Sequence, residues 1–454
     1  MTEPRRWVTA ADLGLLTDRY ELSMLQAYWA SGMRANATFS LYFRKMPGAR
    51  RFMLACGQRY AAQLITQLRY PKAAIDELSR LGDFQDAFLR WLEDFRFTGD
   101  ILAMPEGTPV FPQEPLLEVT GPIAEVQLLE TILMNLVHLE TVLASKAVRM
   151  VIAAAGRPVV DFGMRRMHGI DAAVHGVRAY RTAGIAGTSH VLAGLHFGLP
   201  VSGTMAHSYI QVHDDESAAF KAYADLYPGT TLLVDTYDSL AAVDRIVALH
   251  RGFGKAFEIG AIRLDSGDLA ALSLEARKRL DAAGLHDVRI FASGGLDEHK
   301  IASLVAAKAP IDAFGVGTAL GTSADAPSLD LVYKLTTYDG IPRLKNSPGK
   351  QIYPGAKQVF RFRSPTGVYE FDEVTLRDER RDAEPLLVPI VSGGTPLPSA
   401  TPDAATAASY AKTQIDSLPP PLRAIDPGGA QYDVRISRAV HDLRASATSR
   451  LQHC

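Results

Sequence analysis

Apolar residues in the first third of the chain follow more than one spacing. Three segments, 20–30, 58–68 and 84–95, repeat them at helical intervals. The segment 37–43 instead alternates apolar and polar residues as a strand does, and two short β-like runs broken by proline follow at 110–112 and 115–120. This mixture predicts an N-terminal α+β domain over residues 1–126.

The pattern becomes regular after residue 126. A long helix with one apolar face is predicted over 127–155, and short runs rich in Val, Ile and Leu then alternate with helical segments. The strand candidates are 158–162, 199–202, 231–234, 261–264, 288–292 and 313–316. The helices between them are 171–182, 216–226, 239–251, 269–283 and 297–307. Repeated strand–helix units favour a parallel sheet, so we predict an α/β barrel over 127–334.

The alternation stops near residue 335. Segments 353–363 and 368–374 are typical of antiparallel strands joined by a turn. The stretch 392–405 is rich in Gly, Pro, Ser and Thr and is predicted to be a loop, and 430–451 offers one strand and one helix. Residues 335–454 therefore form a separate C-terminal segment.

The composition is that of a soluble globular protein, with 47% hydrophobic and 22% charged residues and a formal net charge of −2. This balance excludes the basic footprint expected for nucleic acid or an anionic membrane. Two cysteines, Cys56 and Cys454, are too few for a disulfide framework or a cysteine zinc site, and we expect Cys56 to be buried as a small apolar residue. Without a signal peptide or an apolar run of about 18 residues, the protein is expected to be cytoplasmic.

Polar and glycine-rich loops follow six of the predicted strands in succession. In a barrel, the carboxyl ends of the strands carry the active site. The residues found there are Arg165, Arg166, His207, Asp235, Asp238, Arg263, Asp265, Gly294, Gly295, Gly317 and Thr318. Cationic, acidic and glycine-rich loops at one edge are suited to an anionic sugar phosphate together with a divalent metal ion.

Two of these loops are candidates for a phosphate site. Gly294-Gly295 precedes a predicted helix, and Gly317-Thr318 follows the last predicted strand. Backbone N–H groups at helix N-termini bind phosphate, and the last two strands of a barrel commonly supply them. The alternative is a pair of tight turns whose glycines take positive φ. The paired placement favours the phosphate site.

The charged residues divide between binding and structure. Arg165 and Arg166 either clamp a phosphate or carboxylate with a planar guanidinium or lie on the surface as solvated charges. Asp265 suits a ribose hydroxyl or Mg²⁺. Asp238 and Asp268, one turn further on, suit the N-caps of the following helices.

His207 is the candidate with the most specific chemistry. A single histidine is more often structural, but this one follows a predicted strand, has Thr204 and Ser208 beside it and faces acidic loops. A histidine whose second ring nitrogen is oriented by a partner can act as a nucleophile or as an acid–base group. We therefore predict a catalytic role for His207.

Eight motifs, taken in order, resemble those of the nicotinate phosphoribosyltransferase family. They are LLTDRYE at 15–21, FRKMP at 43–47, DFGMRRMH at 161–168, GIAGTSHVLAG at 184–194, GTMAH at 203–207, IRLDSGDL at 262–269, ASGGLDE at 292–298 and PGAKQV at 354–359. The likeness extends from residue 15 to the closing segment 432–443 and is specific in combination.

The resemblance implies a type II phosphoribosyltransferase fold. This is an irregular TIM-like α/β barrel of about seven strands beside an α+β domain built from both chain ends, with 335–454 packing back on the N-terminal domain. It also implies a homodimer whose active sites are shared across the interface. The implied partners are nicotinate, phosphoribosyl pyrophosphate and ATP, with Mg²⁺ as the cofactor.

The resemblance also implies a role for each site residue. Tyr20 of the partner subunit would stack on the pyridine ring, Thr204 and Arg263 would lie near nicotinate, and Asp265 near the ribose. Gly294, Gly295, Gly317 and Thr318 would hold the 5-phosphate. His207 matches the histidine that the family phosphorylates from ATP, and Asp235 would orient its ring.

Ser189 bears on whether the substrate is the acid or the amide. The related nicotinamide phosphoribosyltransferases carry an Asp at this position, which accepts from an amide NH₂ and repels a carboxylate. Ser189 does not repel, so nicotinate is favoured over nicotinamide.

Three other functions agree less well with the sequence. Quinolinate enzymes are shorter and need more cationic groups. A catalytically silent barrel that senses pyridine nucleotides has no use for His207. A sugar-phosphate aldolase needs a Schiff-base lysine or a histidine metal cluster at the strand ends, and the loops contain neither.

Overall fold

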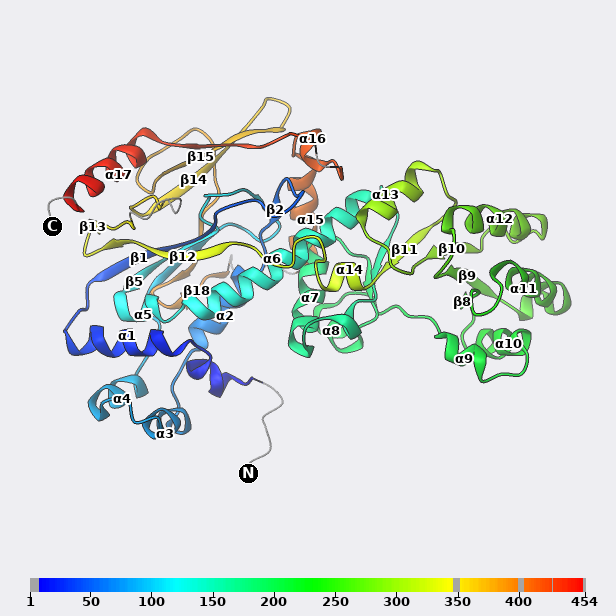
Figure 1. The fold of residues 1–454 in the computed structure, drawn as a ribbon, viewed down its shortest axis with the longest axis horizontal. Coiled ribbons are helices and arrows are strands. Elements are labelled where there is room, and N and C mark those ends of the chain that lie inside the picture. The colour runs from blue at the N-terminus through cyan, green and yellow to red at the C-terminus, as the bar shows by residue number, and fades with distance from the viewer. Residues whose placement is uncertain (1–7, 346–351, 399–403, 427, 452–454) are drawn as a thin grey trace. The chain divides into compact units, whose positions relative to one another are not determined.

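The chain divides into two compact units. The computed structural model describes residues 8–345, 352–398, 404–426 and 428–451, so Cys454 and part of the predicted loop 392–405 lie outside it. One unit comprises residues 1–142, 328–424 and 428–454, and the other comprises 143–327 and 425–427. Figure 1 colours the chain from blue to red, and both ends belong to the first unit.

The first unit is built on two larger sheets, one fully antiparallel and one that includes a parallel pair of strands, together with a two-stranded antiparallel sheet. Seven strands form its main sheet in the order β13-β12-β1-β5-β3-β17-β18, and four form a second in the order β16-β14-β15-β19. The strands are β1 Asn36–Phe43, β2 Met53–Leu54, β3 Asp100–Ala103, β4 Pro109–Val110, β5 Leu117–Pro122, β12 Leu331–Tyr338, β13 Ile341–Pro342, β14 Lys357–Arg363, β15 Tyr369–Leu376, β16 Glu384–Pro385, β17 Val388–Ser392, β18 Thr395–Pro396 and β19 Asp433–Ile436. Pairing of β1 with both β5 and β12 shows why both chain ends are needed.

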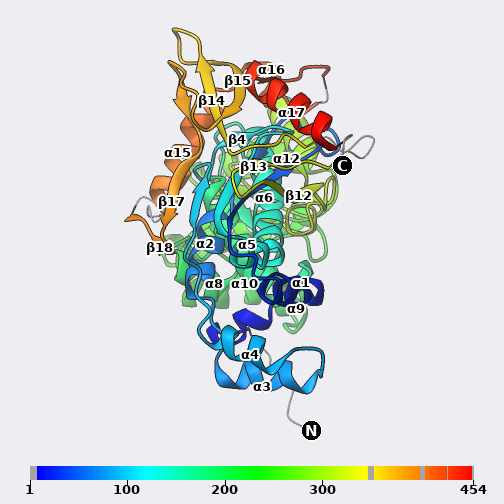
Figure 2. The ribbon, with the colours of Figure 1, turned by 90° about the vertical axis from the view of Figure 1, so that its left-hand side faces the viewer.

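The helices of this unit fall partly in the segments predicted to be helical. They are η1 Ala10–Leu15, α1 Arg19–Ala30, α2 Gln58–Gln67, α3 Lys72–Arg80, α4 Asp86–Glu93, α5 Ile123–Gln127, α15 Ala404–Asp416, α16 Pro420–Arg423 and α17 Arg438–Leu451. Figure 2 shows α17 beside β15. The nine-residue α3 was missed from the sequence although it buries Ala74, Ile75 and Leu78 along one side, because so short a stripe is a weak signal.

A buried carboxylate joins the two larger sheets of this unit. Glu118 on β5 is fully buried and accepts hydrogen bonds from Ser40 Oγ at 2.5 Å, from the Lys357 backbone N–H at 2.7 Å and from Arg377 Nη2 at 2.7 Å. These partners come from β1, from the first residue of β14 and from the turn after β15. The network therefore ties strands that are more than 200 residues apart in sequence.

The predicted loop 392–405 is wrong at its start. Val391 pairs with Pro396 and Ser392 with Thr395, so β17 and β18 form a hairpin. Its two turn residues, Gly393 and Gly394, have φ of 53° and 73°, as a tight hairpin turn of this kind requires. The two glycines therefore form the turn of a hairpin and do not belong to a long irregular loop.

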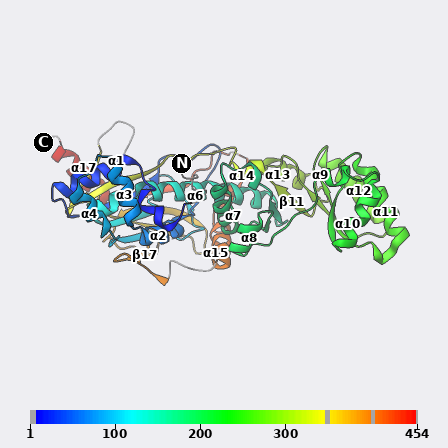
Figure 3. The same ribbon diagram turned by 90° about the horizontal axis from the view of Figure 1, so that it is seen from below.

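The second unit is a parallel α/β sheet with six strands in the order β7-β6-β11-β10-β9-β8. The strands are β6 Val159–Asp161, β7 Gly187–Thr188, β8 Thr230–Leu233, β9 Ile259–Leu264, β10 Arg289–Ala292 and β11 Ala313–Val316. The helices are η2 Met164–Arg166, α7 Ile170–Thr182, α8 Val191–Phe197, α9 His207–Gln211, α10 Glu216–Leu226, α11 Ser239–Phe253, η3 Gly254–Ala256, α12 Leu269–Ala282, α13 Glu298–Ala306 and α14 Thr318–Gly321. Figure 3 shows α9 to α12 gathered in one part of this unit.

This sheet confirms the predicted α/β class but differs from the strand assignment in two places. The two-residue strand β7 was missed, and 199–202 contributes a single bridge, from Val201 to Thr188, instead of a strand. Counted with that bridge, the sheet has seven positions. The described strands form a curled sheet with β7 and β8 at its edges, which is an incomplete barrel.

Aspartates start four of the helices in this unit. Asp238 accepts from the N–H of Ala241 at 2.8 Å, and Asp268 accepts from the N–H groups of residues 270 and 271 at 3.1 Å, so both predicted N-caps are confirmed. Asp215 and Asp297 cap α10 and α13 in the same way. These caps fix where each loop ends and its helix begins.

One helical stretch has the hydropathy of a membrane span. Residues 123–153, which include α6 (Glu130–Ala153), are long and apolar enough to cross a membrane by length and composition. However, 61% of the apolar window is buried within the protein, as in the core helix of a soluble protein. We therefore interpret α6 as a core helix.

Candidate active site

Arg263 lies at the centre of the polar edge of the parallel sheet. It is the fifth residue of β9, and its guanidinium donates to three side chains: Ser293 Oγ at 2.7 Å, Thr204 Oγ1 at 3.0 Å and Asp265 Oδ1 at 2.6 Å. The guanidinium carbon also lies 5.1 Å from the ring centroid of Phe162, which follows β6. One side chain thus connects four different loops of the sheet.

His207, Asp235 and Asp265 form a cluster at the same edge. One ligand atom from each lies within 4.8 Å of the others, and all three side chains are half-buried. His207 begins α9, Asp235 follows β8 and Asp265 follows β9. The structure therefore brings together three of the predicted site residues. An imidazole beside two carboxylates can support phosphoryl chemistry or hold a divalent cation.

The hydrogen bond to His207 differs from the expected one. Nδ1 of His207 lies 3.2 Å from Thr236 Oγ1, so a threonine hydroxyl, and not Asp235, is the group that orients the ring. Asp235 Oδ2 accepts from Ser266 Oγ at 2.6 Å, whereas its Oδ1 is buried without a hydrogen-bond partner among the described residues. Asp235 was expected to orient the ring, but Thr236 does so. Thr236 lies one residue further along the loop after β8, and its hydroxyl reaches Nδ1 of His207.

Gly294 permits a very close approach between two loops. Its φ is +88°, and a Cβ built on it would lie 1.6 Å from the backbone carbonyl oxygen of Asp265. Ser293, just before it, donates a short hydrogen bond to Asp265 Oδ1. Gly295 has a φ of +59°, and its carbonyl accepts from Lys300 Nζ at 2.7 Å. Gly294 is therefore required both by its positive φ and by the approach of the Asp265 carbonyl, whereas Gly295 is required by its positive φ alone.

The second glycine loop is built differently. Gly317 has φ of −125°, so the tight-turn alternative with positive φ does not hold at this position. Thr318 begins α14, and the Thr318 side chain is exposed. A Cβ on neighbouring Gly163 would lie 3.1 Å from the Gly317 carbonyl, so the loops after β6 and β11 pack closely.

Asp161 holds the loops that carry Arg165 and Ser189. It is buried, and its two carboxylate oxygens accept from the Gly163 N–H and from Thr188 Oγ1, each at 2.7 Å. Its backbone carbonyl accepts from the Ser189 N–H at 2.8 Å. Burial raises the pKa of Asp161. Ser189 is half-buried, whereas Arg165 on η2 is exposed to solvent.

Tyr20 belongs to the first unit and lies on the first turn of α1. Its side chain is 47% exposed. Burial of part of its ring, with the carboxylates of Glu130 and Glu21 nearby, raises its pKa. Tyr20 therefore remains protonated and keeps an exposed ring available for contact.

The neighbouring Glu21 anchors this turn and leads to a pH-dependent prediction. It is fully buried, accepts from Thr17 Oγ1 at 2.8 Å and from Thr131 Oγ1 at 2.9 Å, and burial raises its pKa to about 7. Because the pKa is higher in the folded state than in the unfolded one, Glu21 stabilises less as pH rises from about 4.5 to 7. Glu21→Gln should therefore gain stability relative to wild type as pH increases, by up to about 3 kcal/mol at pH 8.

Thermal melting at pH 5, 6, 7 and 8 measures this difference. The matched control is Glu77→Gln, an exposed acid on α3. A melting temperature for Glu21→Gln that runs parallel to wild type at every pH would contradict the prediction.

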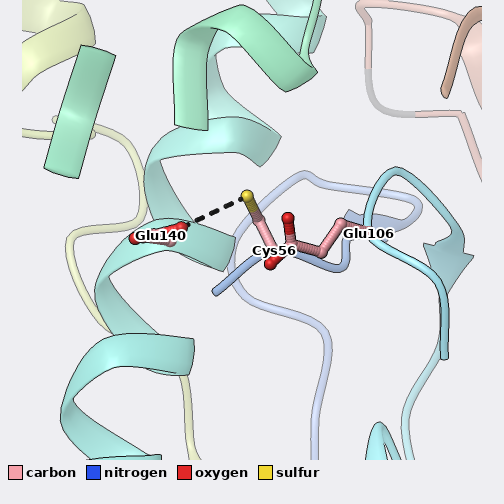
Figure 4. Close-up of side chains that lie close together, drawn as sticks. All are labelled: Cys56, Glu106 and Glu140. Carbon is pink, nitrogen blue, oxygen red and sulfur yellow. Dashed lines mark hydrogen bonds between the residues drawn. The ribbon is translucent and has the colours of Figure 1, made fainter. Parts of the chain in front are cut away.

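A second cluster of potential metal ligands lies in the first unit, shown in Figure 4. Cys56, Glu106 and Glu140 are buried, with one ligand atom of each within 4.8 Å of the others. Several of their hydrogen bonds are structural: Glu106 Oε1 accepts from the N–H groups of Gly57 and Arg59, and Cys56 Sγ donates to Glu140 at 3.5 Å. The first two bonds secure the start of α2. The expected burial of Cys56 is confirmed.

Three hydroxyl-bearing residues of the site were missed from the sequence. Thr236 contacts His207, Ser266 contacts Asp235, and Ser293 contacts both Arg263 and Asp265. Each stands next to a predicted site residue. Their position next to a predicted site residue was therefore the only signal in the sequence. The spacing of residues does not show in which direction a side chain points after the end of a strand.

A parallel α/β sheet with cationic, acidic and histidine side chains collected at the carboxyl ends of its strands defines an α/β enzyme. Comparison with known proteins agrees. Residues 15–138 match the model of the nicotinate phosphoribosyltransferase N-terminal domain, and residues 158–355 match the model of the nicotinate phosphoribosyltransferase family.

Individual relatives resemble nearly the whole chain. Nicotinate phosphoribosyltransferase pncB2 of Mycobacterium tuberculosis is 50% identical over 439 residues, covering 97% of this chain and 94% of its own. The Bacillus subtilis nicotinate phosphoribosyltransferase is 38% identical, covering 81% of this chain and 77% of its own. The crystal structure of the human nicotinic acid phosphoribosyltransferase superposes with a TM-score of 0.84 at 28% identity, over 95% of this chain and 100% of its own.

The chain belongs to the nicotinate phosphoribosyltransferase family. Its parallel sheet is the type II phosphoribosyltransferase fold that the motif order implied, as the human structure confirms.

Proposed function

We propose that this enzyme joins nicotinate to phosphoribosyl pyrophosphate, forming nicotinate mononucleotide and pyrophosphate for NAD salvage, with ATP hydrolysis coupled through His207. Family membership supports the overall reaction. The observation that carries the site assignment is the arrangement of Arg263, which contacts Thr204, Asp265 and Ser293 at one edge of the sheet. A cation held in this way is suited to the carboxylate of nicotinate.

The two glycine loops would bind the 5-phosphate, and Asp265 would accept a hydrogen bond from the ribose. Support comes from the φ of +88° at Gly294, which brings the loop 293–295 against Asp265. The pyridine nitrogen then attacks C1 of the ribose, the bond from C1 to the pyrophosphate oxygen breaks, and pyrophosphate leaves. Positioning and electrostatics would supply most of the catalysis, because the transition state resembles an oxocarbenium ion.

His207 would be the nucleophile toward ATP. Its Nδ1 is occupied by Thr236 Oγ1 at 3.2 Å, which leaves Nε2 for attack on the γ-phosphorus of ATP. The new N–P bond replaces the bond to the β-phosphate oxygen, and ADP leaves. Water later hydrolyses the phosphohistidine to phosphate and restores the free imidazole.

Mg²⁺ fits the same edge of the sheet. Asp235 and Asp265 would hold it with carboxylate oxygens, the ligands that Mg²⁺ prefers, and the buried, unpartnered Oδ1 of Asp235 supports this assignment. When bound, Mg²⁺ supplies positive charge that offsets the negative charge of the pyrophosphate.

Specificity and assembly follow from three residues. Ser189 carries no charge to repel the nicotinate carboxylate, which favours the acid over nicotinamide. Arg165, exposed after β6, would add a second cation for an anionic substrate group. Tyr20, with its exposed ring, would stack on the pyridine of a partner subunit in a cytoplasmic homodimer with shared active sites.

A product assay tests this proposal. Nicotinate and nicotinamide are each supplied with phosphoribosyl pyrophosphate and Mg²⁺, with and without ATP, to wild type and to His207→Ala. We expect nicotinate mononucleotide from the acid only, with stimulation by ATP lost in the variant, because the alanine cannot accept a phosphoryl group.

Other outcomes identify other functions. Turnover of nicotinamide would overturn the assignment of Ser189. Stimulation by ATP that survives in His207→Ala would exclude the phosphohistidine. No turnover of either substrate would favour a silent barrel that senses pyridine nucleotides.

A further inference from the structure

Lys146 on α6 carries a buried charge that the proposed reaction does not use. Only 2% of its side chain is exposed. Its Nζ donates to Glu298 Oε2 at 2.5 Å and lies 2.8 Å from Asp325 Oδ1. Removing such charges from water costs several kcal/mol per ion. Apolar residues in place of a buried ion pair often stabilise a protein at least as much as the pair does. Stability alone therefore does not explain this triad.

Glu298 connects Lys146 to the first glycine loop. It is the first residue of α13, three positions after Gly295, and is fully buried. Arg149, one turn along α6, donates to Glu298 Oε1 at 2.9 Å. Burial alone would raise the pKa of Glu298, but the bonds from Lys146 and Arg149 hold it below its usual value. The start of α13 is thus fixed to α6 by an ionised carboxylate with two cationic partners.

Asp325 connects Lys146 to the second glycine loop. Helix α14 begins at Thr318, and the turn after it is tightly closed: Ala324 donates its N–H to the Ala319 carbonyl at 3.2 Å, and Ser323 Oγ donates to the Ala326 carbonyl at 2.8 Å. Asp325 lies within this turn. Because the helix is short and the turn is closed by hydrogen bonds, the position of Asp325 determines the position of Thr318.

We propose that Lys146 is a positioning residue that sets the separation of the loops 294–295 and 317–318 around a sugar phosphate. The inference rests on the proposed function, because the phosphate is assigned to these loops. One ammonium contacts the helix that follows the first loop and the turn that follows the second. A phosphate dianion bound between the loops needs the N–H groups of both loops at a fixed distance from each other. If the loops are not held, they must be ordered on binding, and this ordering weakens the affinity.

Asp325→Asn is a conservative substitution that tests this role. It removes the charge at one end of the bridge, while the bond from Lys146 to Glu298 remains, and the Asp325 side chain is already 29% exposed. The matched control is Asp244→Asn, which breaks the 2.5 Å ion pair with Arg279 between α11 and α12 of the same unit. Kinetic constants and hydrogen–deuterium exchange are measured for wild type and both variants.

We expect KM for phosphoribosyl pyrophosphate to rise about tenfold in Asp325→Asn, with KM for nicotinate and kcat changed less than threefold. Amide exchange should increase in peptides that cover 293–297 and 316–326. Asp244→Asn should match wild type in all of these. Lys146→Met, the harsher variant, should raise the same KM further if it folds.

An Asp325→Asn enzyme that matches Asp244→Asn in both KM and loop exchange would overturn the proposal. Equal increases in KM for both substrates would also overturn it, because they indicate a general structural role. A wild-type protein that does not use phosphoribosyl pyrophosphate would contradict the proposed function instead. In that case the exchange data still decide whether Lys146 holds the two loops.

Discussion

Replacing Arg263 with alanine is expected to lower kcat/KM for nicotinate by roughly a thousandfold. The variant loses three charge-assisted hydrogen bonds, to Thr204, Asp265 and Ser293, together with the cation proposed to face the substrate carboxylate. Asp265 also loses its ion pair at 2.6 Å, so its carboxylate faces the anionic substrate uncompensated. Steady-state kinetics with varied nicotinate measures the change.

A second arginine of the same sheet provides the control. Arg289 is the first residue of β10 and is exposed, so Arg289→Ala removes an arginine at the amino end of a strand and should change kcat/KM less than threefold. Arg263→Lys keeps the charge but not the planar fork and should fall between the two. An Arg263→Ala enzyme within tenfold of wild type would show that Arg263 is not central to the site.

Gly294→Ala is expected to abolish most activity, with kcat/KM for phosphoribosyl pyrophosphate reduced at least a hundredfold. An alanine Cβ would lie 1.6 Å from the Asp265 carbonyl oxygen, which is an impossible contact, so one of the two loops must move. Both loops belong to the proposed site, and a displacement of about 1 Å there costs roughly a hundredfold. The measurement is kcat/KM with varied phosphoribosyl pyrophosphate, together with the melting temperature.

Gly284 separates steric displacement from backbone strain. It lies after α12 with φ of +77°, and a Cβ added to it would have no heavy atom within 4 Å, so Gly284→Ala carries only the cost of positive φ, about 1 kcal/mol. We expect a small loss of stability and normal kinetics from this control. If Gly294→Ala and Gly284→Ala behaved alike, the close approach of Gly294 to Asp265 would not matter for activity.

The sequence determined the fold class and most elements of the catalytic unit. Strand–helix alternation identified β6 and β8 to β11, because buried parallel strands are continuous apolar runs that differ clearly from amphipathic helices. The positions of Asp238 and Asp268 after strands identified two N-caps, since capping depends on residues only three apart. Motif order identified the family.

The sequence also selected the residues that meet at the site. His207, Asp235 and Asp265 lie together because the carboxyl ends of parallel strands share one edge of a sheet. Spacing alone could place them at this edge, but it could not say which of them touch. The prediction that Asp235 orients His207 was wrong for this reason, since side-chain direction depends on how each loop turns after its strand.

Only the tertiary structure decided the partners of the buried charges. Glu118 bonds Lys357, 239 residues away, and Lys146 bonds Glu298, 152 residues away. Such pairs leave no periodic signal, because each member satisfies a local pattern of its own and the pairing arises only when distant elements pack. The same holds for Gly294, where the need for glycine comes from the carbonyl of Asp265 on another loop. Local propensity and periodicity determine elements, whereas long-range packing determines which polar atoms meet.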